Sequence, residues 1–108
     1  MTLTNIHEAQ EWFEVLQTGE QSQTAMMTLK PGDATGEKAK AHEKSDQVLL
    51  MLSGKLSGTV GPETVNLKKG DLLLIRAGTL HRFKNRGRRR AVTFNVYSPP
   101  EYPPDTKG

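Results

Sequence analysis

Short runs of apolar or alternating residues, separated by turn-forming residues, recur along the whole chain. They predict strands at residues 12–16, 24–29, 38–42, 47–52, 56–60, 64–67, 72–75, 81–84 and 91–97. Runs of this length are typical of strands and too short for buried helices. Only residues 6–11 favour a helical turn, because Asn5 can cap it and Glu8 follows three residues later. Many short strands with Gly and Pro turns predict an all-β sandwich or barrel.

One stretch carries the strongest pattern. The apolar run 72–75 lies between two glycines and predicts a strand that is covered on both faces. After the turn, His81, Phe83 and Asn85 fall on one face of the next strand, and the basic residues between them fall on the other. This period of two directs an imidazole toward the inside of a β structure, where a small barrel can hold a ligand or a metal.

The spacing of this stretch closely resembles the second conserved motif of the cupin family. Gly70, Gly78, His81 and Asn85 all stand at motif positions, and Arg76 stands where the family usually has proline. Because proline pre-sets the backbone of a turn, this departure affects only the turn chemistry.

A partial version of the first cupin motif lies upstream. Counting back from its terminal glycine places Gln47 at the carboxylate position, and Lys40 and His42 at the two histidine positions. A register one residue shorter would use Ala41 and Glu43 instead and would turn His42 outward. We prefer the first register because it keeps the only available imidazole inside. The resemblance extends over residues 25–97.

The resemblance implies an all-β double-stranded β-helix, that is, a jelly-roll or cupin barrel. We expect a single domain over residues 1–108, with the barrel core at about 12–97 and a Pro-rich C-terminal tail at 98–108. A cupin barrel binds its ligand inside, so the resemblance also implies a small-molecule ligand with oxygen atoms.

The implied site has two sets of residues. The metal ligands are His42, Gln47 and His81, and the ligand-binding residues are Lys40, Phe83 and Asn85. Imidazole and oxygen donors suit a divalent transition metal such as Zn, Fe, Mn, Ni or Cu. Gln47 is neutral, however, and a cation at Lys40 would repel a metal unless its ammonium group reaches the barrel mouth.

Two alternatives follow from these departures. One is a metal-dependent enzyme of the dioxygenase or isomerase type. The other is a non-catalytic ligand-binding or sensor cupin with an incomplete, metal-free site, in which His42 and His81 bond to each other, to Gln47 or to water. The residues assign no catalytic group, because no side chain other than the histidines is an unambiguous general acid or base, although Lys40 could act as a base if burial lowers its pKa. His7 lies in a polar context and is expected in solvent.

Composition excludes some classes of protein. The chain has no cysteine, so disulfides and thiolate metal sites are excluded. No apolar run approaches the ~20 residues of a membrane span, and residues 1–8 lack the pattern of a secretory signal. With 34% hydrophobic residues and a mean hydropathy of −0.61, we expect a soluble cytoplasmic protein without a membrane partner.

Basic residues gather at residues 84–90, and the pI is about 9.3. Such a cluster can indicate nucleic-acid binding. No aromatic residue is interleaved with it, and only 6% of the chain is aromatic. We therefore expect a solvated turn and no nucleic-acid partner, with recruitment of an anionic ligand to the barrel mouth as an alternative.

Two strands are apolar on both faces, at residues 48–52 and 72–75. One face of each fills the barrel, and the other must be covered as well. This pattern predicts a homodimer formed sheet to sheet, to which residues 12–13 can contribute. The aromatic residues other than the tyrosines are expected in the core; they are Trp12, Phe13, Phe83 and Phe94.

Overall fold

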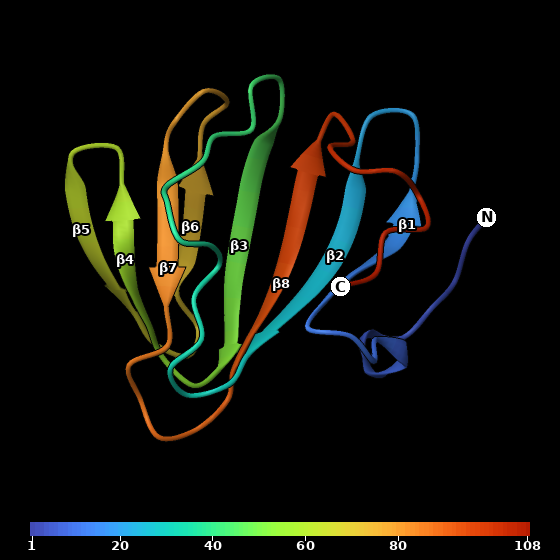
Figure 1. Cartoon of the computed structure of the whole chain (residues 1–108). Helices are drawn as coiled ribbons and strands as arrows, with labels where there is room; N and C mark the ends of the chain where they lie inside the picture. The colour runs from blue at the N-terminus through green and yellow to red at the C-terminus, as the bar shows by residue number, and fades with distance from the viewer.

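The computed structural model describes all 108 residues and is almost entirely β (Figure 1). Its eight strands are β1 (Phe13–Thr18), β2 (Gln23–Leu29), β3 (Asp46–Ser53), β4 (Leu56–Val60), β5 (Glu63–Leu67), β6 (Leu72–Ile75), β7 (His81–Lys84) and β8 (Ala91–Ser98). One 3₁₀ turn, Ile6–Glu8, precedes them, and Asn5 caps it by accepting a bond from the His7 amide. The all-β prediction is confirmed. No helix in the structure is long and apolar enough to cross a membrane.

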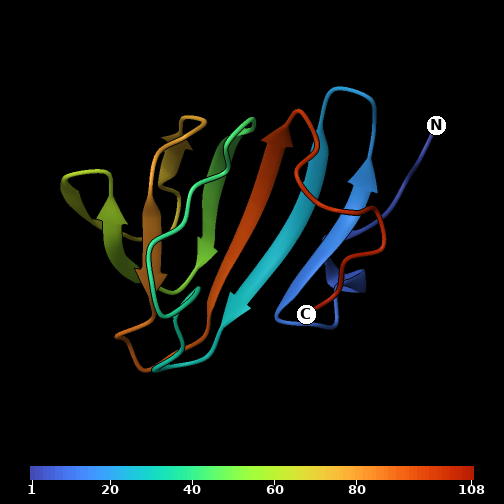
Figure 2. The ribbon, with the colours of Figure 1, turned by 45° about the horizontal axis from the view of Figure 1, so that its top comes forward.

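The strands form two antiparallel sheets that face each other (Figure 2). The larger sheet has the order β1-β2-β8-β3-β6, and the smaller has the order β5-β4-β7. The chain alternates between the sheets, so that β3 and β6 pair in one while β4, β5 and β7 pair in the other. This arrangement is the predicted double-stranded β-helix.

The core lies between the two sheets. Alternate residues of β3 point inward, so that Leu49 and Met51 are buried while Val48 is 38% exposed. Ile75 from β6 and Phe83 from β7 complete the centre of the cluster. Each fully buried side chain of this size stabilises the fold by about 1.5–3 kcal/mol. The same inward alternation places polar side chains in the cavity described below.

Residues 38–42 do not form the predicted strand. They make a single β-bridge, between Lys40 and His81, within a long loop that connects β2 to β3. The segment is mostly polar and exposed, and its alternating apolar residues are only Ala39 and Ala41, which are too small to bury much surface against a sheet. His42 therefore reaches the interior from a loop.

Along β6, the outer face of the larger sheet is not covered by any other part of the chain. Within the chain, Leu72 and Leu74 are 70% and 54% exposed, because β6 is an edge strand and no element packs on its outer side. Trp12 is 45% exposed and Phe94 only half-buried, so neither belongs to the core. Phe13 and Phe83 are buried there as predicted.

The C-terminal tail returns along β1. The amide of Val15 donates to the carbonyl of Thr106 at 3.0 Å, and the amide of Gly108 donates to the carbonyl of Phe13 at 2.6 Å. Both bonds hold the tail beside the open edge of the larger sheet (Figure 1). The tail thereby becomes one wall of the cavity.

Candidate functional site

A cavity of about 210 Å³ lies between the two sheets and is bounded by the β2–β3 loop and the tail. Its lining combines aromatic, imidazole, amide and ammonium groups. The residues are Trp12, Phe13, Met27, Thr35, Lys38, Lys40, His42, Gln47, His81, Phe83, Tyr97, Tyr102, Thr106 and Gly108. A larger hollow, of about 530 Å³, is lined without any histidine, carboxylate or aromatic residue. Since the histidines lie in the smaller cavity, we take it as the candidate site.

Backbone hydrogen bonds dock the loop that carries His42 against β7. Lys40 and His81 exchange amide-to-carbonyl bonds of 3.1 and 2.9 Å. Two residues further on, the amide of Gly78 donates to the carbonyl of His42 at 2.8 Å. Gly78 has a φ of 81°, a conformation that glycine adopts without strain, so the tight turn before β7 can present its amide to the loop. These bonds place the His42 ring beside His81.

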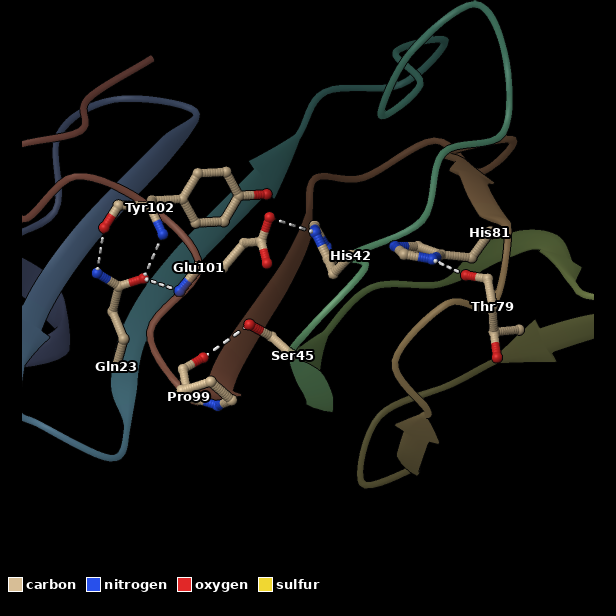
Figure 3. Close-up of polar contacts among 8 residues, drawn as sticks. All are labelled: Gln23, His42, Ser45, Thr79, His81, Pro99, Glu101 and Tyr102. Carbon is tan, nitrogen blue, oxygen red and sulfur yellow. Dashed lines mark hydrogen bonds and ion pairs between the residues drawn. The ribbon is translucent and has the colours of Figure 1, made fainter.

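The two imidazoles face each other across the cavity, with ring centroids 5.0 Å apart (Figure 3). Nδ1 of His81 lies 3.0 Å from the carbonyl oxygen of Thr79. Because a carbonyl only accepts, this nitrogen carries the proton, and Nε2 of His81 is left with a free lone pair. Nδ1 of His42 lies 3.4 Å from a carboxylate oxygen of Glu101, which favours the same tautomer there.

Burial lowers the pKa of His81 below its usual value of 6.5, and the proximity of His42 lowers it further. The bond to the Thr79 carbonyl acts in the opposite direction but is outweighed. His81 is therefore neutral at neutral pH, the form in which an imidazole binds a metal or accepts a hydrogen bond.

Gln47 contributes a buried oxygen that has no partner. The side chain is 4% exposed, and its Nε2 donates to Oδ1 of Asn95 at 3.0 Å. Its Oε1 is buried and makes no hydrogen bond. An unsatisfied buried acceptor costs about 1–3 kcal/mol, so such an atom in a cavity calls for a donor or a cation.

The tail supplies further groups that the sequence did not point to. Glu101 pairs with His42, and Tyr102 packs against His42 and Tyr97 with ring centroids 5.8 and 5.2 Å away. Burial raises the pKa of Tyr97 well above 10.0 and also raises that of Tyr102, so both phenols stay neutral. The inward position of Tyr97 follows from the alternation of β8, whereas no local pattern marks Glu101.

The other predicted residues divide into two groups. Phe83 lines the cavity, and Lys40 lies at its mouth with an exposed side chain, next to Lys38. Asn85 does not reach the cavity, because its buried amide binds the carbonyls of Leu29 and Arg89 at 2.9 and 2.8 Å. Asn85 thus binds the backbone of the β7–β8 loop, and it does not line the cavity in which its contact with a ligand was predicted. His7 is exposed, as predicted.

Residues 25–97 match the family model described as a cupin domain. The chain belongs to the cupin family. Over 67 residues this cupin is 34% identical to an uncharacterized protein of Streptomyces coelicolor, a match that spans 62% of each chain.

Solved structures share the cupin architecture. A crystal structure of a protein from Bacillus halodurans has a TM-score of 0.86 and 25% identity, covering 94% of this cupin and 80% of that chain. A second, from Klebsiella pneumoniae, is described as having a double-stranded β-helix domain; its TM-score is 0.80 at 18% identity, with 92% of this cupin and 90% of that chain covered. Both structures establish the fold of this cupin, and its chemistry has to be inferred from its own residues.

The donor set of this cupin, two imidazoles and one amide oxygen, fits a metal ion that needs few protein ligands. An ion about 2.0–2.1 Å from two tetrahedrally arranged imidazole nitrogens separates the ring centroids by roughly 5 Å. The observed 5.0 Å between His42 and His81 agrees with that spacing. No group of three His, Cys, Asp or Glu side chains is positioned to hold a metal, so the third donor available is the amide oxygen of Gln47.

Proposed function

We propose that the cavity binds a divalent transition metal together with a small, oxygen-bearing anion. His42 and His81 hold the metal through Nε2, and Gln47 contributes its free oxygen. The observation that carries the proposal is that both imidazoles have Nδ1 engaged outside the cavity while the Gln47 oxygen between the sheets lacks a partner.

The contacts behind the rings support this proposal. Histidines that bind metals commonly donate Nδ1–H to a carboxylate or a backbone carbonyl, which sets the tautomer and orients the ring. Glu101 and the Thr79 carbonyl occupy these two roles (Figure 3). When bound, such an ion would hold or polarise an oxygen of the ligand.

The mouth of the cavity favours an anion. Lys38 and Lys40 line it, and both side chains are exposed. Because an exposed lysine keeps its ammonium group in solvent, Lys40 attracts an incoming anion without standing beside the metal. The aromatic walls at Phe83 and Tyr97 complement an apolar part of the same ligand.

Metal analysis of the protein purified without added metal tests the proposal. His81→Ala should remove the bound ion, because it deletes one of only two imidazole ligands, while circular dichroism stays unchanged. His7→Ala is the matched control, since His7 is exposed and outside the cavity. Equal metal content in both variants would place the metal elsewhere.

The second candidate is a metal-free ligand-binding cupin. It is favoured by the neutral donor set, because Gln47 does not supply the charge that a carboxylate would. In this case the two Nε2 atoms accept hydrogen bonds from the ligand, and the Gln47 oxygen accepts a third. Metal absent from the purified protein, and no calorimetric heat with zinc, manganese or nickel, would select this candidate.

We also propose that the chain forms a homodimer through the outer face of the larger sheet. Val48, Leu72 and Leu74 lie side by side there, on the paired strands β3 and β6, and are 38%, 70% and 54% exposed. A contiguous apolar patch of this kind is unfavourable in water and is covered by a second copy in many sheet proteins. Light scattering should give twice the chain mass of 12.0 kDa.

A further inference from the structure

A second hollow lies at the end of the barrel where β7 finishes, whereas His81 stands where β7 begins. Three turns meet there, between β3 and β4, β5 and β6, and β7 and β8, at the lower edge of the view in Figure 1. The hollow has a volume of about 530 Å³. Its lining consists of Gly54, Lys55, Lys68, Lys69, Gly87, Arg88 and Arg89. Residues far apart in the sequence thus bring five cationic side chains around one space.

The β3–β4 turn packs closely against the β7–β8 loop. Gly54 has a φ of 76°, and a Cβ atom at this position would collide with the carbonyl oxygen of Arg90. Only glycine allows this approach, so Lys55 is held next to the loop that carries Arg88 and Arg89.

Asn85 fastens that loop from inside the barrel. Its Nδ2 donates to the carbonyl of Arg89 at 2.8 Å, and its Oδ1 accepts from the amide of Gly87 at 2.9 Å. The side chain of Asn85 is fully buried. The backbone that presents Arg88 and Arg89 is therefore ordered before any ligand arrives, which reduces the entropy lost on binding.

The β5–β6 turn is ordered in the same way. The amide of Lys68 donates to Oδ2 of Asp71 at 2.8 Å, and the amide of Gly70 donates to the carbonyl of Met51 at 2.8 Å. The Lys68 ammonium lies 3.4 Å from Asp71, and the other four cationic side chains of the hollow have no ion-pair partner. Positive charge is thus concentrated on ordered turns, and only one of the five cationic side chains is paired with a carboxylate.

We infer that this basic hollow is a binding site for a compact polyphosphate anion, distinct from the histidine cavity. Arg and Lys side chains recognise phosphate oxygens through charge-assisted hydrogen bonds. The hollow is lined without aromatic or other apolar side chains, so it offers nothing on which a nucleobase stacks. Its cationic residues come from three turns around one space, which suits a compact anion that contacts all three better than an extended strand.

Titration calorimetry of the full chain with inorganic tripolyphosphate tests the inference. Arg88→Gln combined with Arg89→Gln should weaken binding at least about tenfold, because two charge-assisted contacts are lost. Arg86→Gln combined with Arg90→Gln is the matched control. It removes the same charge from the same loop, but neither side chain lines the hollow. We expect the control to bind within about twofold of the parent.

Three results would overturn the inference. The first is no saturable heat with tripolyphosphate at low salt. The second is equal weakening in the two double variants, which would show attraction to net charge alone. The third is a single-stranded oligonucleotide that binds more tightly than tripolyphosphate and is not displaced by it, which would make the surface a nucleic-acid interface. Circular dichroism of both variants confirms folding, since all four arginines are exposed.

Discussion

Gln23 holds the tail that closes the histidine cavity, and its replacement is the most informative perturbation of the site. The side chain is 1% exposed. Its Nε2 donates to Oγ1 of Thr18 at 2.9 Å and to the carbonyl of Tyr102 at 2.8 Å, and its Oε1 accepts from the amides of Glu101 and Tyr102 at 3.1 and 3.0 Å. One amide thus fixes the two tail residues that contact His42 (Figure 3).

The cost of Gln23→Ala follows from these four bonds. Each hydrogen bond contributes about 0.5–1.5 kcal/mol net, and the released tail amides regain water, so we expect a loss of about 2–4 kcal/mol in the free energy of unfolding. That is a large part of the roughly 5–15 kcal/mol typical of a domain. Gln17→Ala is the control: Gln17 is half-buried and bonds only to Thr2 and Thr24, so its loss should cost less than about 1 kcal/mol.

Gln23→Glu distinguishes the role of the Gln23 acceptor oxygen from that of its donor nitrogen. It keeps the acceptor for the tail amides but turns the donor that faces the Tyr102 carbonyl into an oxygen. At neutral pH a buried carboxylate opposes that carbonyl, so the variant should be less stable than the parent. The difference should shrink as the pH falls and the carboxyl group becomes a protonated donor.

Urea denaturation measures both variants, and calorimetry with zinc or a small carboxylate reports on the cavity. Gln23→Ala should weaken cavity binding as well as stability, because Glu101 no longer orients His42. Two results would refute the idea that Gln23 acts on the site through the tail. One is a change of less than about 0.5 kcal/mol in the free energy of unfolding of Gln23→Ala, and the other is the predicted loss of stability with unchanged binding of the cavity ligand.

Three further predictions concern the cavity, the exposed sheet face and the pH. Gln47→Glu should tighten zinc binding in calorimetry, since a carboxylate replaces the buried amide oxygen; an unchanged affinity would mean that Gln47 does not adjoin the metal. Leu74→Glu should give a monomer in light scattering, and a persistent dimer would place the interface elsewhere. Burial lowers the pKa of His81 below 6.5, so the unfolded chain binds more protons than the folded chain once the pH falls through this value. The free energy of unfolding should therefore decrease as the pH falls below 6.5, and an identical pH profile for His81→Gln would contradict this.

The sequence predicted the strands well where alternation and turn residues agree. The runs around Leu72 and His81, each bounded by turn residues, coincide with β6 and β7. The segment around His42 misled the prediction because its residues alternate as in a strand, whereas it is a loop docked by backbone bonds to His81 and Gly78. Backbone contacts of that kind depend on the partner strand, which local sequence does not describe.

The cavity was predictable only in part for a similar reason. The alternation of side chains along β7 is a local property, so the inward position of Phe83 followed from the strand period. Gln47 was placed by its resemblance to the first cupin motif, and the alternation of β3 agrees with that position. Asn85 falls on the same face as Phe83 in this alternation, but it lies just past the end of β7. Its buried amide there binds backbone carbonyls. Glu101 reaches His42 from the far end of the chain, a contact created by tertiary structure alone.

The tail has a consequence for how such sites diverge. Glu101, Tyr102 and Thr106 shape the cavity, yet all three lie beyond residue 97, where the match to the cupin domain ends. A barrel can therefore keep its sheets and its histidines while a change of about ten terminal residues replaces one wall of the pocket. Ligand selectivity in a protein built this way can evolve, or be engineered, by exchanging an appendage rather than by altering the scaffold.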